Sequence, residues 1–424
     1  MNCFHKTLCY TSPAHGGWGM VRIGMSVPDS FQIFFSPPAC GRHGAISSVL
    51  HRYRNRLAYY FLEEKDVVSG GYEKQIFDAV DLVLKRLKKK PRAMLLFVTC
   101  IDDLMGTDLE ELTLELKDRF QEIDFTFCHM DPIRNDSKLP PPQNIQHQMY
   151  ALLEKKELKK DTVNCIGNLM PIDEDCELYS ILNHMGIKNI NHILNCRDYD
   201  EFKNMASAYC NLMISPNGAA AVKSMNNTIG IPYEEVAVSY DLDIIQNQYK
   251  KLMNTLASNI SQKEKQAINT IISYMEEQAV NEVENTKKLI GNIPIYIDSS
   301  AVAHPYELAW FLHRKGFLIK GIFAEKPSES EKEAFQNLVT VCSDIQIVLP
   351  QHPKTMIRSQ DIKDTFSIGF EAAYTTQSRY VLDLFSDEGM FGYYGVIKLM
   401  KMMRKCYENP VDLKKLLDSY GLVV

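Results

Sequence analysis

Three cysteines stand in glycine-rich segments or at the end of an apolar run. Cys9 lies in LCYTSPAHGGWG, Cys40 lies in SPPACGRHG, and Cys100 ends AMLLFVTC. Glycine lets a backbone approach a metal cluster closely, and thiolates are the usual ligands of iron–sulfur clusters. One interpretation is therefore that the three thiolates meet at one iron–sulfur cluster. The gaps, from 9 to 40 and from 40 to 100, match no local motif, so three unrelated free thiols are the alternative.

Most of the remaining cysteines are expected to pack in the core and not to act as ligands or nucleophiles. The total of 11 is odd and too sparse for a disulfide scaffold, which favours a reducing compartment. Four of them lie in or beside strand-like runs and are expected to fill the core: Cys128, Cys165, Cys196 and Cys342. Cys3, six residues before Cys9, is a further possible ligand.

The common nucleotide and hydrolase motifs are absent from the sequence. It has no GxxxxGK[ST], no HExxH, no CxxC and no GxSxG, and Gly17-Trp18-Gly19 does not continue as a GxGxxG after a strand. We therefore expect that this chain binds no nucleotide.

Composition excludes two further classes. The 424 residues carry a net charge of −6, which does not fit a general nucleic-acid binder. The longest apolar run, Ala93 to Ile101, is far shorter than the roughly 20 residues of a membrane span. The N-terminus lacks the apolar core of a signal peptide, so a cytoplasmic protein without membrane contact is expected.

Apolar strand-like runs alternate with amphipathic stretches, which predicts an α/β fold with parallel sheets. The clearest predicted strands are Ala93–Cys100, Phe125–His129, Val163–Gly167, Ile190–Leu194, Leu212–Ser215, Ile293–Ile297, Phe317–Phe323 and Ile345–Leu349. The clearest predicted helices are Tyr72–Lys89, Asp108–Gln121, Asp175–Met185, Ser224–Ile229 and Pro305–Lys315.

Composition shifts divide the chain into three predicted domains, at residues 1–160, 161–290 and 291–424. A proline-rich break, Asp136–Gln143, precedes a predicted lysine-rich helix, Glu154–Lys160. A polar helix, Ser261–Leu289, is expected to be a solvated connection. The first 50 or so residues are punctuated by Gly and Pro, and we expect mostly irregular backbone there.

Several segments, in this order, resemble one known family. They are Cys9 with GGWG, Phe35–Gly41 (FSPPACG), Glu64–Gly71 (EKDVVSGG), Thr99–Asp108 (TCIDDLMGTD) and Ile229–Tyr233 (IGIPY). Together they are similar to component 1 of nitrogenase and its relatives, which include light-independent protochlorophyllide reductase and nickel-sirohydrochlorin diamide reductive cyclase. The similarity covers most of the chain and is densest in residues 1 to 130.

The resemblance implies three Rossmann-like domains, each a parallel sheet flanked by helices. It implies that Cys9, Cys40 and Cys100 hold the iron of a cluster, either 4Fe-4S or a larger P-cluster-like one, at a subunit interface. The partners that it implies are a second component 1-type subunit, either a paralogue or an identical chain, and an ATP-dependent nitrogenase reductase-like iron protein.

The sequence departs from molybdenum nitrogenase at the two ligands of the active-site cofactor. The position of the cofactor cysteine falls near Ile214 or Ser215, and Cys210 is offset from it. The last histidine is His352, so the C-terminal histidine ligand is also missing. Dinitrogen reduction by this chain is therefore not expected.

The candidates for catalytic residues are His43 and His304. His15, Arg42, Glu371 and Tyr374 are further residues that could line a substrate cavity. We expect an oxidoreductase subunit that passes electrons from the iron protein to a small molecule or a tetrapyrrole. The alternatives are a scaffold on which a metallocofactor is assembled, and an α/β binding protein without a cluster.

Overall fold

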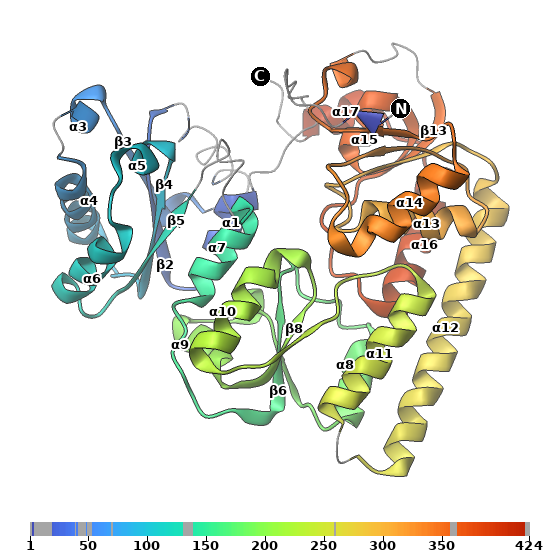
Figure 1. The fold of residues 1–424 in the computed structure, drawn as a ribbon, viewed down its shortest axis with the longest axis horizontal. Coiled ribbons are helices and arrows are strands. Elements are labelled where there is room, and N and C mark those ends of the chain that lie inside the picture. Colours follow the sequence, from blue (N-terminus) through green and yellow to red (C-terminus); the bar gives the residue numbers. More distant parts are fainter. Residues whose placement is uncertain are drawn as a thin grey trace. The chain divides into compact units, whose positions relative to one another are not determined.

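The computed structural model describes residues 2–3, 19–38, 40, 48, 53–68, 71–129, 139–257, 260–356 and 363–419. Over these residues the chain forms three sheets whose paired strands are all parallel, flanked by helices (Figure 1). This confirms the predicted α/β class. The chain groups into two compact units: the first unit is residues 17–171 with 189–235, and the second unit is residues 1–16, 172–188 and 236–424. The three predicted domain ranges stay a prediction.

The first sheet belongs to the first unit. Its order is β3 (Leu57–Phe61), β2 (Ser30–Ser36), β4 (Ala93–Val98) and β5 (Asp124–His129). Every residue of the central strands β2 and β4 is buried, because helices cover both faces. One face packs on α4 (Tyr72–Arg86) and α6 (Leu109–Arg119), and the other on α1 (Gly19–Met25) and α7 (Pro141–Tyr150). Two short helices follow β3 and β4: α3 (Glu64–Val68) and α5 (Cys100–Met105).

The second sheet completes the first unit. Its order is β7 (Asn189–Asn191), β6 (Lys159–Ile166), β8 (Ala208–Met213) and β9 (Tyr233–Glu235). Its helices are α9 (Tyr199–Asn204) and α10 (Ala219–Ile229). The buried Asn164 side chain donates to Asn211 at 2.8 Å and accepts from Asn191 at 3.0 Å, so three strands are cross-linked by amides. One apolar cluster contains residues of both sheets and of α7, so the two sheets share a core.

The six-stranded sheet belongs to the second unit. Its order is β1 (Asn2–Cys3), β12 (Gln346–Val348), β11 (Ile319–Phe323), β10 (Ile295–Asp298), β13 (Lys363–Ile368) and β14 (Ser378–Leu382). The helices of this unit are α8 (Glu177–His184), α11 (Leu242–Leu256), α12 (Gln262–Ile290), α13 (Pro305–Arg314), α14 (Lys332–Val341), α15 (Phe370–Thr376), α16 (Gly392–Glu408) and α17 (Leu413–Ser419).

Short 3-10 helices connect several elements. They are η1 (Arg54–Arg56), η2 (Ile193–Asn195), η3 (Met205–Ser207), η4 (Pro216–Gly218), η5 (Glu329–Glu331) and η6 (Pro353–Met356). None of the helices in the described part of the chain has the length and apolar character needed to cross a membrane.

Three local expectations were wrong. Helix α1 and the buried strand β2 lie in the first 50 residues, where irregular backbone was expected. Residues 151–158 form no helix, and only Lys159 and Lys160 of the predicted helix Glu154–Lys160 lie in a regular element, where they begin strand β6. Helix α12 is not merely a solvated connection, because Ile272 and Val283 on one of its faces are buried, and the Thr286 hydroxyl on that face bonds the Met400 carbonyl of α16.

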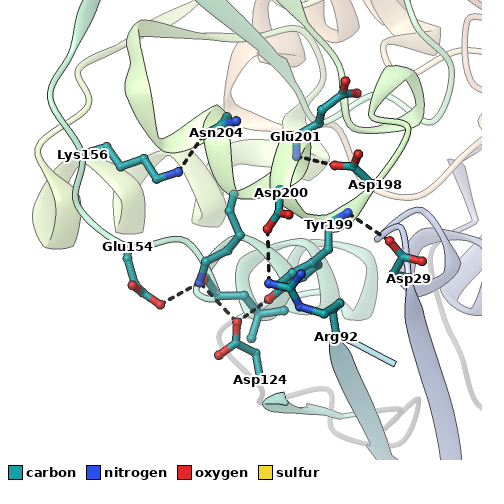
Figure 2. Close-up of polar contacts among 12 residues, drawn as sticks. Asp29, Arg92, Asp124, Glu154, Lys156, Asp198, Tyr199, Asp200, Glu201 and Asn204 are labelled. Atoms are coloured by element: carbon teal, nitrogen blue, oxygen red, sulfur yellow. Dashed lines mark hydrogen bonds and ion pairs between the residues drawn. The ribbon is translucent and has the colours of Figure 1, made fainter. Parts of the chain in front are cut away.

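A polar clasp connects helix α9, beside the second sheet, to the first sheet at the amino ends of β2 and β5 (Figure 2). It consists of Asp29, Asp124, Tyr199 and Lys203. The Tyr199 hydroxyl donates to Asp124 at 2.6 Å, and its backbone N–H donates to Asp29 at 3.3 Å. The Lys203 ammonium donates to Asp124 at 3.2 Å and to the Leu152 carbonyl at 2.6 Å. A polar cleft of about 600 Å³ opens beside the clasp.

The clasp gives the first prediction. Tyr199→Phe removes one hydrogen bond from a carboxylate but keeps the buried ring, so we expect the free energy of unfolding to fall by about 1–2 kcal/mol. Urea unfolding of the full chain measures this. Arg197→Gln is the control, because Arg197 forms only an exposed pair with Glu201 and should change stability little. Equal effects of the two substitutions would contradict a stabilising clasp.

Candidate functional site

Cys40 and Cys100 lie at the carboxyl edge of the first sheet. Cys40 follows β2, in a turn where its N–H donates to the Pro37 carbonyl at 3.0 Å. Cys100 follows the adjacent strand β4 and is the first residue of α5. Parallel strands end at the same edge of a sheet, so the pairing of β2 with β4 brings the two cysteines to one place. Both are partly buried, and neither forms a disulfide.

The two thiols are close enough to interact electrostatically. Burial, and then the neighbouring Cys100, raise the pKa of the Cys40 thiol. Two thiolates that repel each other are stabilised by a shared cation, and metal binding is what deprotonates such thiols. The donor set therefore fits a site at which iron is held by sulfur.

Other site predictions fall outside the described residues. Cys9, His15, Arg42 and His43 are among them. Within the described ranges, no group of three or more His, Cys, Asp or Glu side chains could hold a metal ion. The predicted joining of Cys9 with Cys40 and Cys100 stays a prediction.

Contacts before and after α5 fix the segment that carries Cys100. The Asp102 N–H donates to the Thr99 carbonyl at 3.0 Å, and burial together with the Asp102 charge raises the pKa of Tyr72 on α4. Gly106 ends α5 with a φ of +66°, a left-handed conformation that favours glycine. Asp108 then caps α6 by accepting from the Glu110 and Glu111 N–H groups. Asp108 thus has a structural role in the segment Thr99–Asp108, as the cap of α6.

His304 lies in the second unit, at the N-terminal end of α13. Its ring is nearly buried, and Nδ1 lies 3.1 Å from the Val238 carbonyl oxygen. Because a carbonyl only accepts, Nδ1 carries the hydrogen in this contact. His304 follows β10 and lies in the second unit, whereas Cys40 and Cys100 lie in the first unit.

Sequence reasoning missed two buried aspartates at the carboxyl edge of the six-stranded sheet. Asp298 ends β10 and accepts from the Ala372 N–H at 2.8 Å, and burial raises its pKa to about 6. Asp387 accepts from the Tyr240 hydroxyl at 2.9 Å and the Ala303 N–H at 3.0 Å, and burial raises its pKa to about 6 as well. Asp298 directly follows the predicted strand Ile293–Ile297, and this position was the signal for it in the sequence.

The backbone around Asp387 is strained. Ser386, Asp387, Glu388 and Gly389 all have positive φ, between 34° and 75°. L-residues with side chains rarely adopt this left-handed region, so three in succession, followed by a glycine, need support from the surrounding structure. The N–H groups of Ser386 and Asp387 donate to the carbonyls of Ser300 and Ala301, which supply it. No sequence pattern signalled this turn.

The residues at the expected cofactor-cysteine position do not offer a thiolate. Ile214 is fully buried, and Ser215 caps η4 by accepting from the Asn217 N–H. Cys210 lies inside strand β8 and is buried.

Comparison with known proteins identifies the family. The family model described as "Nitrogenase component 1 type Oxidoreductase" matches residues 16–405. A solved structure described as "Nitrogenase Cp1 at pH 6.5" superimposes with a TM-score of 0.66 at 10% identity, over 96% of this chain and 94% of that one. A second, "Nitrogenase Cp1 at pH 5", gives 0.61 at 15% identity, over 96% and 92%.

The chain belongs to the nitrogenase component 1 type oxidoreductase family. The fold confirms the resemblance seen in the sequence, since three parallel sheets flanked by helices match the solved nitrogenase structures over nearly their whole length. A search of curated proteins by sequence found no match.

The buried aspartates give a prediction on pH dependence. A carboxyl whose pKa is raised on folding binds its proton more tightly in the native state, so its contribution to stability is lost as pH rises from about 4 to about 6. We expect the unfolding free energy of the wild type, relative to Asp387→Asn, to fall by about 2–3 kcal/mol over that window. Urea unfolding at several pH values measures the difference.

The control for this series is Asp418→Asn, a substitution at an exposed position of α17. The difference in unfolding free energy between the wild type and this control should not fall between about pH 4 and about pH 6. Asp298 is present in every protein compared, so its titration cancels in the difference. A wild-type advantage over Asp387→Asn that stays constant from pH 4 to 7 would contradict the raised pKa.

Proposed function

We propose that this chain is a catalytic-component subunit that binds an iron–sulfur cluster through Cys9, Cys40 and Cys100 at a subunit interface. It accepts electrons from an ATP-dependent iron protein and reduces a small molecule or a tetrapyrrole. The observation that carries the proposal is the convergence of Cys40 and Cys100 at the ends of adjacent parallel strands, in a chain of this family. When bound, the cluster, 4Fe-4S or larger, would accept and pass on single electrons.

Apolar side chains exposed beside the two cysteines support an interface at this sheet edge. Phe61 ends β3 and is 50% exposed, Val68 ends α3 and is 80% exposed, and Leu104 on α5 is 85% exposed. These three residues follow the strands β3 and β4, next to the segments of Cys40 and Cys100. Exposed apolar residues that gather in one place are typical of a protein interface. The occupant that we propose is a second component 1-type subunit, identical or paralogous.

The division of labour with a separate iron protein is supported by the sequence. The 424 residues contain no phosphate-binding GxxxxGK[ST] motif, so the proposed ATP-dependent step belongs to the partner.

The residues at the expected cofactor-cysteine position bear on the substrate. The absence of a thiolate at Ile214 or Ser215 argues against a nitrogenase-type cofactor held by this chain. The same absence equally suits a scaffold that releases a metallocofactor.

Anaerobic purification with iron and acid-labile sulfide analysis tests the proposal. The chain is co-expressed with a candidate partner subunit, since an interfacial cluster can be lost from a lone chain. We expect iron and sulfide in the wild type, an EPR signal after dithionite reduction, and a loss of at least 80–90% of the iron in Cys40→Ser and in Cys100→Ala, because each removes a ligand.

Cys406→Ala is the matched control, because Cys406 is a partly buried cysteine on α16 with no part in the proposed site. It should keep the wild-type iron content. Iron that does not depend on Cys40 or Cys100 would overturn the proposal. Iron and sulfide that transfer to another protein without substrate turnover would favour the scaffold over the reductase.

The interface gives a separate prediction. Leu104→Asp adds a charge to a side chain that contacts little, so the stability of the lone chain should change by less than about 0.5 kcal/mol. Association with the second subunit should weaken at least tenfold, because a buried unpaired charge is costly. Sedimentation velocity of the complex measures this. Leu114→Asp is the control, on an exposed position of α6, and a similar loss there would contradict the assigned edge.

A further inference from the structure

Two buried hydroxyls at the cysteine edge of the first sheet have no hydrogen-bond partner among the described residues. They are Ser36 Oγ at the end of β2 and Thr99 Oγ1 directly before Cys100. Ser36 is fully buried and Thr99 is 3% exposed. The backbone carbonyls of these two residues do have partners, since Ser36 accepts from the Leu62 N–H and Thr99 accepts from the Asp102 N–H. The groups without a partner are therefore the side-chain hydroxyls.

Strand register predicts that the two hydroxyls lie on the same face of the sheet. In the parallel pair β2–β4, the last paired residues are Phe34 and Phe97, and their rings stack at 4.4 Å on one face of the sheet. Side chains of a strand alternate between the two faces, so a residue two positions further on returns to the same face. Continued for two residues past this pair, the register would align Ser36, the last residue of β2, with Thr99, the residue after β4.

A buried hydroxyl without a partner destabilises a fold, because it gives up its hydrogen bonds to water. Two other buried hydroxyls of the same sheet do have partners. Thr126 on β5 bonds Gln148 at 3.0 Å, and Ser30 bonds the Val27 carbonyl at 2.7 Å. The two residues directly before Ser36 and directly before Thr99 are apolar, and an apolar residue would suit these two positions as well. The pair therefore points to an acceptor that arrives with a ligand.

We propose that the Ser36 and Thr99 hydroxyls donate hydrogen bonds to sulfur atoms of the cluster held by Cys40 and Cys100, and so raise its reduction potential. This rests on the proposed function. Reduction adds negative charge to a cluster, and donors aimed at its sulfurs stabilise the reduced form more than the oxidised form. Ser36 and Thr99 act through the cluster and are positioning residues, not ligands.

Thr99→Val and Ser36→Ala remove the hydroxyls with little change in volume. We expect both variants to hold the wild-type iron and sulfide content, with a midpoint potential shifted downward in each and furthest in the double variant. Potentiometric EPR titration measures this. Thr126→Val is the matched control, since it removes a buried hydroxyl of the same sheet that already has a protein partner. Its potential should equal that of the wild type.

Stability provides a readout that needs no electron transfer. In the cluster-free chain, Thr99→Val should not destabilise, because no hydrogen bond is lost, whereas Thr126→Val should. In the cluster-loaded protein, Thr99→Val should lose stability or shed iron faster. Thr99→Ser keeps the hydroxyl and should restore the wild-type iron content and potential wherever Thr99→Val lowers them.

Three outcomes would overturn the inference, and they are distinguishable. Full iron content with an unchanged potential in the double variant removes the role of the hydroxyls but leaves the cluster proposal standing. Failure of Thr99→Ser to restore what Thr99→Val loses shows that shape, not the hydroxyl, matters. Iron that does not depend on Cys40 or Cys100 overturns the proposed function, and the inference falls with it.

Discussion

The parallel pairing of β2 with β4 is the constraint on which the candidate site depends. It aligns the ends of two strands that are separated by more than 50 residues of sequence, and the segments with Cys40 and Cys100 begin there. The pairing is itself held by burial, since both strands are covered on both faces and contribute to two apolar clusters. A change in register by one residue would turn every side chain of β2 to the opposite face. The positions of Cys40 and Cys100 therefore depend on the packing of the buried residues of β2 and β4.

The first unit carries this constraint, and the clasp of Asp29, Asp124, Tyr199 and Lys203 keeps its two sheets together at the opposite ends of the strands. In this unit the clasp lies at the amino edge of the first sheet and the two cysteines lie at its carboxyl edge. The second unit places its own buried acids, Asp298 and Asp387, at the carboxyl edge of the six-stranded sheet. The carboxyl edge is where open parallel sheets commonly place their ligand sites.

Much of the fold could be predicted from apolar runs, because strands such as β4 and helices such as α13 have clear periodicity. Strand β2 was missed since the glycines and prolines around it masked a seven-residue buried run. The location of Cys100 at a strand end followed from its sequence, but its proximity to Cys40 depends on strand order, which no local pattern specifies. The left-handed turn at Ser386–Gly389 was out of reach, because tertiary hydrogen bonds support a backbone that its residues do not favour.

The interleaving of the two units has a consequence for synthesis on the ribosome. All of the first unit has been translated once residue 235 has been added, whereas the six-stranded sheet pairs Asn2 with Ile347 and needs residues as late as Leu382. Contacts so distant in sequence form slowly, since a long loop must close before they stabilise anything. The part of the first sheet that carries Cys40 and Cys100 can thus fold while the second unit is still being translated. Its exposed apolar residues Val68 and Leu104 are then accessible to other proteins before synthesis of the chain ends.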